Sequence, residues 1–256
     1  MGLDDRGALR VLHDAFAVPP DGSGLVAQFF TRWFGTDPSV RDLFPADLTT
    51  QRAAFAHAMS WVLGEFIDQR AQEPVALLAQ LGRDHRKYGV TQRHYSVIGQ
   101  VLLATLRDEL ADSWTVAVDD AAREALNLII GVMGGAADAE EGPAWWDGTV
   151  VEHLRVSRDL TVVRIQLDQP LPYHPGQYVK VEVPQCPRSW RYLSPSMPAD
   201  ETGAIEFHVR AVPAGLVSTA IVNETRPGDR WRLSSPHGGL HVDRDAGDVL
   251  IYRYHF

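Results

Sequence analysis

The spacing of apolar residues divides the chain into two parts, because helices and strands bury their side chains at different intervals. Residues 90–110 carry buried-type side chains at steps of three and four, the period of one helix face: Tyr95, Ile98, Leu102 and Leu106. Thr91 precedes them as a helix cap. Residues 119–135 repeat the period, and Gly134 with Gly135 is the predicted end of that helix.

A shorter helix is predicted within residues 36–45, where Asp37 is a suitable cap and Pro38 fits the first turn. No alternation of apolar and polar residues precedes residue 148. We therefore expect the first part of the chain to be all-helical, with six to eight helices.

The second part changes to a period of two. Apolar residues alternate with polar ones within residues 162–168, 178–183 and 204–212, and the inward set is Val163, Ile165, Leu167, Val179, Val181, Val183, Ile205, Phe207 and Val209. Loops rich in proline and glycine separate these segments. Short strands of this kind predict an antiparallel barrel or sandwich. The change of period predicts a helical domain over residues 1–140, a linker over 141–147 and a strand domain over 148–245.

Composition excludes several classes of protein. The chain has 256 residues and a net charge of −9, which argues against a nucleic-acid surface. No apolar run is long enough to span a membrane, and the first residues lack a signal-peptide core. The one cysteine, Cys186, rules out an internal disulfide and fits a reducing compartment, so we expect a cytoplasmic protein.

The helical part contains candidate chemistry, although one histidine among 10 carries little weight without partners. The segments FFTRWFGTDPSVRDLFP, QRAAFAHAM and RDHRKYGVTQRHYSVIGQVLLATL, together with the last helix, resemble the globin module of bacterial flavohaemoglobins. The resemblance extends over residues 5–138 with almost no gaps. It implies a globin fold that binds haem b.

The resemblance also implies a role for each matching residue. His85 matches the proximal histidine that ligates haem iron, and Tyr95 matches the tyrosine beside it. Phe44 matches the phenylalanine that wedges the haem. Gln51 and Phe55, four residues apart on one helix face, match the distal pair over the ligand.

Two residues depart from the family pattern. Phe30 stands where the family has a distal tyrosine, so Gln51 is the remaining donor to bound dioxygen, and we expect faster loss of dioxygen. In the alternative interpretation, Phe30 changes only the packing of the pocket and not its function. Asp138 lies only roughly where the family has a proximal glutamate, which predicts a less electron-rich imidazole at His85.

The strand part contains four further segments in order: YHPGQYVKVEV, WRYLSPSMP, AVPAGLVSTAI and TRPGDRWRLSSPHGGL. They resemble the flavin-binding barrel of ferredoxin-reductase-like enzymes over residues 148–242. The implied fold class is therefore multidomain, an all-α globin fold followed by an antiparallel β-barrel that binds FAD.

The flavin motifs imply a second set of residues. Arg191 matches the cation for the pyrophosphate, Ser194 the hydroxyl near the redox nitrogen, and Tyr178 the tyrosine that contacts flavin. Gly215 would let backbone amides approach a phosphate, and Val217 and Ser218 continue that motif.

The arginine motif itself is altered. Leu193 stands where the family has a tyrosine, and Tyr192 is one place early. A shift of one residue turns a strand side chain to the opposite face, so Tyr192 replaces that tyrosine only if a bulge redirects it. In the alternative interpretation, Arg191 and Tyr192 are ordinary solvated strand residues.

The family continues into an α/β domain that binds NADH, and residues 246–256 match only its first strand. We therefore expect no NAD(P)H site in this chain. Either the chain is a shortened gene product or a fragment, or it takes electrons from another donor.

The leading hypothesis is an oxidoreductase in which FAD supplies electrons to haem, with dioxygen and nitric oxide as ligands and nitrate as product. A separate reductase or NADH-binding partner would supply electrons to the flavin. The altered motifs resemble a divergent, actinobacterial-like subgroup, in which a hydroxy acid would replace NADH as donor. The alternative is a haem protein that binds or senses oxygen or nitric oxide and carries a relict flavin site.

Overall fold

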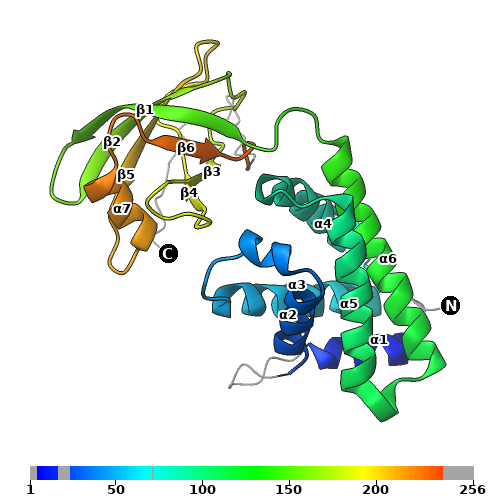
Figure 1. The fold of residues 1–256 in the computed structure, drawn as a ribbon. Helices are drawn as coiled ribbons and strands as arrows, with labels where there is room; N and C mark the ends of the chain where they lie inside the picture. The colour runs from blue at the N-terminus through cyan, green and yellow to red at the C-terminus, as the bar shows by residue number, and fades with distance from the viewer. Residues whose placement is uncertain (1–4, 17–23, 71, 239–256) are drawn as a thin grey trace. The chain divides into compact units, whose positions relative to one another are not determined.

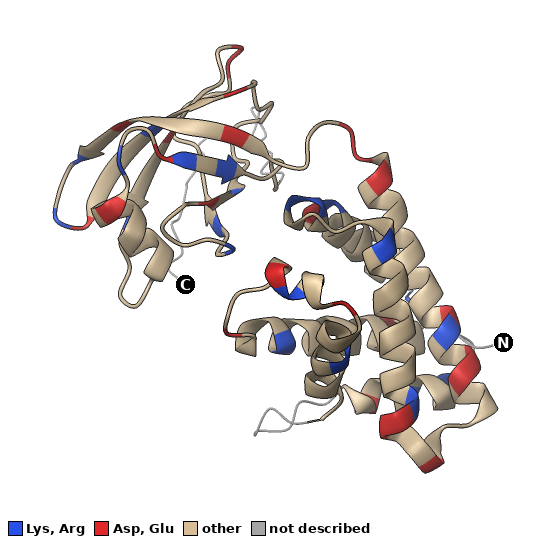
Figure 2. Ribbon diagram, viewed as in Figure 1, with Lys and Arg blue, Asp and Glu red and all other residues tan. Residues whose placement is uncertain are grey.

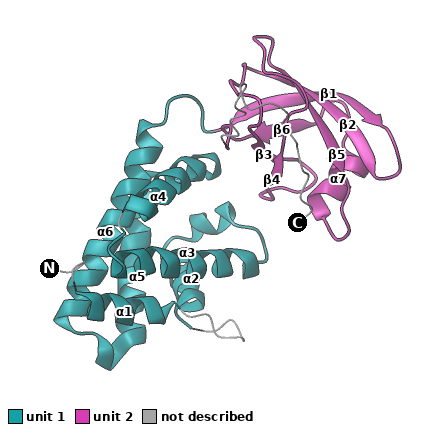
Figure 3. Cartoon of the chain, turned by 180° about the vertical axis from the view of Figure 1, so that it is seen from behind, with its two compact units in different colours: residues 1–144 teal, residues 145–256 magenta. Residues whose placement is uncertain are grey.

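The computed structural model describes residues 5–16, 24–70 and 72–238. The chain forms two compact units, residues 1–144 and 145–256 (Figure 3). The first strand of the second unit begins at Trp146, inside the segment predicted as linker over 141–147. The strand predicted over residues 246–256 lies outside the described residues.

Unit 1 is helical throughout its described part (Figure 1). The described residues of this unit form six α-helices: α1 (Arg6–Ala15), α2 (Leu25–Thr36), α3 (Thr49–Ile67), α4 (Gln72–His85), α5 (Gln92–Leu110) and α6 (Val116–Ala139). Three short 3₁₀ helices connect them: η1 (Pro38–Leu43), η2 (Arg86–Tyr88) and η3 (Ala111–Ser113). The prediction of an all-helical first part is confirmed.

Two predicted helix caps are present. The side chain of Asp37 accepts a hydrogen bond from the backbone N–H of Ser39 at 3.2 Å, and Pro38 begins η1. Thr91 caps α5 in a reciprocal arrangement, because its own backbone N–H donates to Nδ1 of His94 at 2.9 Å. These caps fix where the chain enters two helices of the candidate site.

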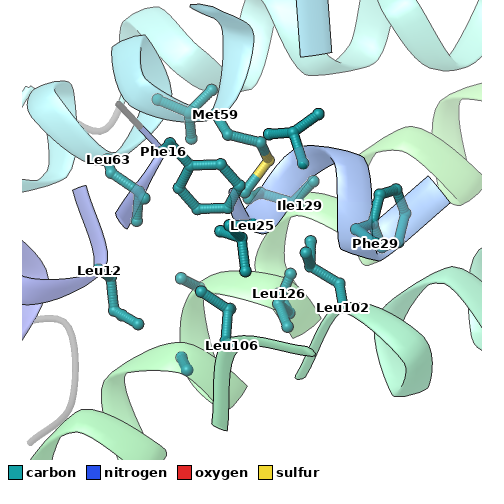
Figure 4. Close-up of a cluster of buried hydrophobic side chains, with 14 of the residues drawn as sticks. Leu12, Phe16, Leu25, Phe29, Met59, Leu63, Leu102, Leu106, Leu126 and Ile129 are labelled. Carbon is teal, nitrogen blue, oxygen red and sulfur yellow. The ribbon is translucent and has the colours of Figure 1, made fainter. Parts of the chain in front are cut away.

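The core of unit 1 lies where the helices meet (Figure 4). The predicted helix-face residues apart from Tyr95 are buried or half-buried in it. Side chains from α1, α2, α3, α5 and α6 contribute: Leu12, Phe16 at the end of α1, Leu25, Phe29, Met59, Leu63, Leu102, Leu106, Leu126 and Ile129. Burial of such side chains contributes about 1.5–3 kcal/mol each, so this cluster is the main source of the unit's stability.

The predicted end of the last helix is wrong. Helix α6 continues through Gly134 and Gly135 to Ala139. A glycine inside a helix costs only about 1 kcal/mol relative to alanine, and tertiary contacts exceed that cost here. The side chain of Gln92 packs against Gly134 and donates to Asp138 at 2.6 Å, which ties the last turns of α6 to α5.

Unit 2 is an antiparallel sheet of six strands with one helix in its described part. The elements are β1 (Trp146–Arg155), β2 (Leu160–Leu167), β3 (Val179–Glu182), β4 (Arg191–Leu193), β5 (Ala204–Arg210), α7 (Leu216–Glu224) and β6 (Arg230–Leu233). The strand order is β4-β3-β6-β1-β2-β5. A bridge between Pro195 and Phe207 joins the two ends of this order, so the sheet nearly closes into a barrel.

The predicted alternation in this unit is confirmed. The inward residues of β2, β3 and β5 are at most 4% exposed, and they pack with Trp231 and Leu233 of β6. Gly148 allows the sheet to close tightly, since a Cβ there would lie 2.6 Å from Cγ2 of Ile165. The outer face is polar, and Arg164 pairs with both Glu152 and Glu206.

Acidic and basic residues are interspersed along the ribbon in the described parts of both units (Figure 2). Within the described ranges, no helix combines the length and the hydropathy that a membrane span requires.

Candidate functional site

His85 is the last residue of α4, and its imidazole is held by its own helix. Nδ1 lies 2.5 Å from the carbonyl oxygen of Leu81. A carbonyl only accepts, so Nδ1 carries the proton, and the lone pair of the neutral ring is on Nε2. This tautomer is the one that ligates a metal through Nε2, with the backbone as the orienting partner.

Helix α4 is fixed against α6 by a contact of two backbones. A Cβ on Gly82 would lie 2.1 Å from the carbonyl oxygen of Met133, so only glycine fits at this crossing. Gly82 is one turn before His85, and the contact therefore sets the position of the imidazole.

The turn after His85 packs around its ring. The ring of Tyr88 lies 6.1 Å from the imidazole in an edge-to-face arrangement. The buried ammonium of Lys87 donates to the carbonyl of Asp84 at 3.0 Å and lies 4.7 Å from the centre of the Tyr88 ring. Gly89 ends the turn with a φ of 76°, a left-handed conformation that favours glycine.

Tyr95 follows on the first turns of α5 and is buried at 4% exposure. Its hydroxyl contacts no hydrogen-bond partner among the residues that the structure describes. Burial, followed by the charge of Asp138, raises the pKa of Tyr95 to about 12. The hydroxyl is therefore neutral at physiological pH and available as a donor.

A cluster of aromatic rings joins α2, the residue after η1 and α3. Phe30 is 3% exposed and meets Phe44 at 5.6 Å and Phe55 at 6.0 Å, both edge to face. Phe55 also stacks on Phe29 at 5.0 Å. The structure thus brings together three of the predicted residues, and Gln51 lies one turn before Phe55 on α3.

The loop that carries Phe44 is held by one cation. The guanidinium of Arg41 donates to the carbonyls of Phe44, Pro45 and Ala46 at 3.1, 2.8 and 2.9 Å. Three charge-assisted bonds to successive carbonyls fix the backbone of this loop. Figure 1 shows η1 and α3 facing α4, the helix that ends at His85.

Buried polar atoms without partners mark this region. Within the described part of unit 1, Oε1 of Gln51, Nε of Arg52, Nε1 of Trp33 and the hydroxyl of Tyr95 are buried and make no hydrogen bond. A buried orphan costs about 1–3 kcal/mol, so native proteins keep few of them. Two of them are donors at or beside predicted site residues, the hydroxyl of Tyr95 and Nε of Arg52, which fits a prosthetic group and a ligand that carry acceptors. The described residues hold no cluster of three or more His, Cys, Asp or Glu suited to a metal ion.

The strand unit carries the second predicted set of residues. Lys180 pairs with Tyr192 across β3 and β4, and Val179 pairs with Leu193. Leu193 packs against the core, whereas Tyr192 is 60% exposed. The two side chains point to opposite faces, as the period of two predicts.

The face that Tyr192 occupies is also that of Tyr178. Their rings lie 5.2 Å apart at 89°, and the ammonium of Lys180 is 5.0 Å from the centre of the Tyr192 ring. Tyr178 is fixed by two backbone bonds to His237, at 3.0 and 2.8 Å, and its ring stacks on that histidine at 5.8 Å. The result is a partly exposed pair of tyrosines beside a cation.

The remaining predicted residues line the strand and the helix start. Arg191 and Ser194 are exposed, and one guanidinium nitrogen of Arg191 donates to the carbonyl of Trp190 at 2.8 Å. Gly215 precedes α7, and Val217 is a buried residue in the first turn of that helix. The hydroxyl of Ser218 accepts from the N–H of Val212 and donates to the carbonyl of Gly215, both at 3.2 Å, so it orders the loop.

The sequence patterns did not reveal three groups that shape the candidate site. The carbonyl of Leu81 and the guanidinium of Arg41 act through backbone geometry, which no residue pattern reveals. Trp33 carried a usable signal, because it follows Phe30 by three residues and therefore shares its helix face.

Comparisons with known proteins agree with this division. A model of the globin family matches residues 27–133, and a model of the oxidoreductase FAD-binding domain matches residues 147–242. The flavohemoprotein of Bacillus subtilis is 24% identical over 245 residues, and that of Bordetella pertussis is 29% identical over 259. Each alignment covers 90% of this chain and 61% or 62% of the relative. The chain thus spans about three fifths of the length of these curated relatives.

A solved structure agrees in fold. The flavohemoglobin of Malassezia yamatoensis, determined with bound FAD and heme, superposes with a TM-score of 0.71 at 16% identity. The alignment covers 94% of this chain and 66% of that one. The chain therefore consists of a globin domain followed by an oxidoreductase FAD-binding domain, and over 90% of its length it is similar to flavohemoproteins.

Proposed function

We propose that the chain is a haem- and FAD-dependent oxidoreductase. The observation that carries the proposal is the imidazole of His85, whose Nδ1 is bound to the carbonyl of Leu81 so that Nε2 is the basic nitrogen. The partnerless buried hydroxyl of Tyr95 and Nε of Arg52 support the same assignment, because both are donors and a haem with its ligand would supply acceptors.

On the haem side, His85 is the iron ligand, and Tyr95 is a donor that orients the proximal groups. Phe44 and Phe55 enclose the pocket, and Gln51 donates to its ligand. Phe30 offers no hydrogen-bond donor, which predicts weaker retention of dioxygen than a tyrosine would give. Haem iron supplies the site where dioxygen or nitric oxide binds and where the electron arrives.

On the flavin side, Arg191 binds the pyrophosphate of FAD, while Ser194 and Tyr178 contact the ring system. The backbone at Gly215 and Val217 accommodates phosphate at the start of α7, with Ser218 ordering that loop. Leu193 supports this surface from the core rather than by touching the flavin. The isoalloxazine would instead meet Tyr192, which is exposed beside Tyr178.

The reaction that we propose is nitric oxide dioxygenation. Nitric oxide, dioxygen and one electron combine to give nitrate, with the electron relayed from FAD. A reductase or another electron donor reduces the flavin. We place this reaction in the cytoplasm, because one cysteine and no disulfide fit a reducing compartment.

Nitrate production tests this function directly. The protein loaded with haem and FAD is reduced anaerobically, then mixed with dioxygen and nitric oxide, and nitrate is counted per haem. We expect one nitrate per stored electron in the native chain, and therefore more than one per haem, because reduced FAD stores two further electrons. The variant H85G, with the same haem and FAD added, should yield only the uncatalysed background; equal yields from both would contradict the proposal.

A second candidate function is ligand binding or sensing without turnover. The observation that favours it is Leu193 in the core position, where the family motif has tyrosine. In this case the globin unit would bind dioxygen or nitric oxide reversibly, and the flavin site would be relict. Substoichiometric FAD after reconstitution, with normal haem spectra, would select this candidate over the enzyme.

A further inference from the structure

Trp33 on α2 is a buried side chain with an unexplained polar hydrogen. The residue is 6% exposed, and its Nε1 makes no hydrogen bond to any described part of the chain. An indole N–H only donates, so an acceptor must come from elsewhere or be a ring face. Leaving such a donor unpaired costs about 1–3 kcal/mol, which a native interior rarely tolerates.

The surroundings of Trp33 are the aromatic cluster described above. Its indole stacks on Phe29 at 5.5 Å and meets Phe44 edge to face at 5.5 Å and 80°. Phe30 lies 6.1 Å away. None of these rings offers a conventional acceptor, and Phe30 and Phe44 are themselves proposed to line the ligand pocket.

We propose that the indole N–H of Trp33 donates a hydrogen bond to the small ligand of this pocket, a dioxygen or another diatomic with partial negative charge. Trp33 would thus supply, from one turn along α2, the donor that Phe30 lacks. With Gln51 it gives the pocket two donors rather than one. This inference rests on the proposed haem site, and it concerns how that site retains its ligand.

The variant W33F tests the inference, because phenylalanine keeps the aromatic packing and removes only the N–H and one ring. The matched control is W114F, at a tryptophan whose Nε1 already donates to Asp119 at 3.2 Å. Two quantities are measured on haem-loaded protein: the rate of dioxygen dissociation and the infrared stretch of ferrous carbon monoxide. We expect W33F to release dioxygen about tenfold faster, the loss of one hydrogen bond, and to raise the carbon monoxide frequency. W114F should change neither.

Unchanged rate and frequency in W33F would overturn the inference, even if the variant is less stable. That outcome would indicate that the indole N–H of Trp33 points at the face of the Phe44 ring rather than at the ligand. Failure of haem to bind to the native chain would instead refute the proposed function, so the two failures are distinguishable.

A second measurement serves if W33F does not fold. The 7 tryptophans of the native protein are labelled with ¹⁵N, and the dioxygen and carbon monoxide forms are compared, since both are diamagnetic. A buried indole N–H that shifts between the two forms and exchanges slowly with solvent supports a donor to the ligand. If every indole signal coincides in the two forms, the inference fails.

Discussion

The two units place their candidate functional residues in opposite environments. In unit 1 the side chains of Phe30, Tyr95 and Trp33 are at most 6% exposed, and several polar atoms there have no partner within the described protein. In unit 2 Tyr192, Arg191 and Ser194 lie at the surface. A prosthetic group enclosed by helices requires an interior shaped around it, whereas a nucleotide that lies along a barrel requires only a prepared surface. The helical site is therefore the less tolerant of substitution.

The largest expected effect is on the proximal ligand. The variant H85G should lose the spectrum of histidine-ligated haem, and imidazole added to the buffer should restore it by occupying the space of the side chain. The matched control is H57G, because His57 is an exposed histidine on α3. If H85G kept the native haem spectrum without imidazole, another residue would be the ligand.

The next effect concerns the backbone contact behind that ligand. We expect G82A to lower the free energy of unfolding by about 3 kcal/mol, since the new Cβ overlaps the carbonyl of Met133. Denaturant titration measures the change. The control G64A has no atom within 4 Å of the new Cβ, and it should be neutral or slightly stabilising. Equal stabilities for the two variants would show that the α4–α6 crossing is looser than described.

At the exposed flavin site of unit 2, the expected effect of a substitution is on FAD affinity rather than on folding stability. We expect Y192A to weaken FAD binding roughly fivefold, the value of one aromatic contact, with little change in stability. The neighbouring variant L193A should do the reverse and lower the free energy of unfolding, because Leu193 packs against the core. Flavin fluorescence and thermal unfolding separate the two. The opposite pattern would mean that Leu193, not Tyr192, faces the flavin.

The buried hydroxyl of Tyr95 predicts an alkaline transition. Its pKa rises from the ordinary 10.0 to about 12, so the neutral form is favoured by folding. The stability it contributes is complete below pH 10 and is lost as the pH rises through about 12. Unfolding measured across this window should show a loss that Y95F largely removes. Identical profiles for Y95F and native protein would contradict the assigned burial.

The smallest effect is expected at the surface of unit 1. Hydrogen bonds from Arg123 and Arg107 lower the pKa of Asp119 from 3.8 to about 2. Its stabilisation is present above pH 3.8 and is lost as the pH falls through about 2. We expect D119N to cost about 1 kcal/mol near neutral pH and to remove this acid dependence. D120N, at the exposed neighbour, should leave it intact.

The sequence predicted the architecture well where periodicity was regular. The helix face through Leu102 and the strand alternation through Ile165 were both confirmed, because each follows from repeated burial on one side. The end of α6 was not, since Gly134 is a weak local signal that packing against Gln92 overrides.

The candidate site was only partly accessible to the same reasoning. The resemblance to the family proposes His85 as the iron ligand, but the carbonyl that orients its ring depends on a helical backbone and has no residue signature. The opposite facing of Tyr192 and Leu193 followed from strand geometry. That Tyr192 would meet Tyr178 required the register of β3 with β4, a long-range property that a single sequence does not specify.

The most direct test of the central claim is photoreduction of the flavin in the intact chain. Protein loaded with haem and FAD is illuminated without oxygen in the presence of EDTA and carbon monoxide, and the visible spectrum is followed at several protein concentrations. The account predicts that the flavin bleaches and that the ferrous carbon monoxide spectrum of haem then appears at a rate independent of concentration. Reduced flavin beside haem that stays ferric would contradict the proposed haem and FAD oxidoreductase.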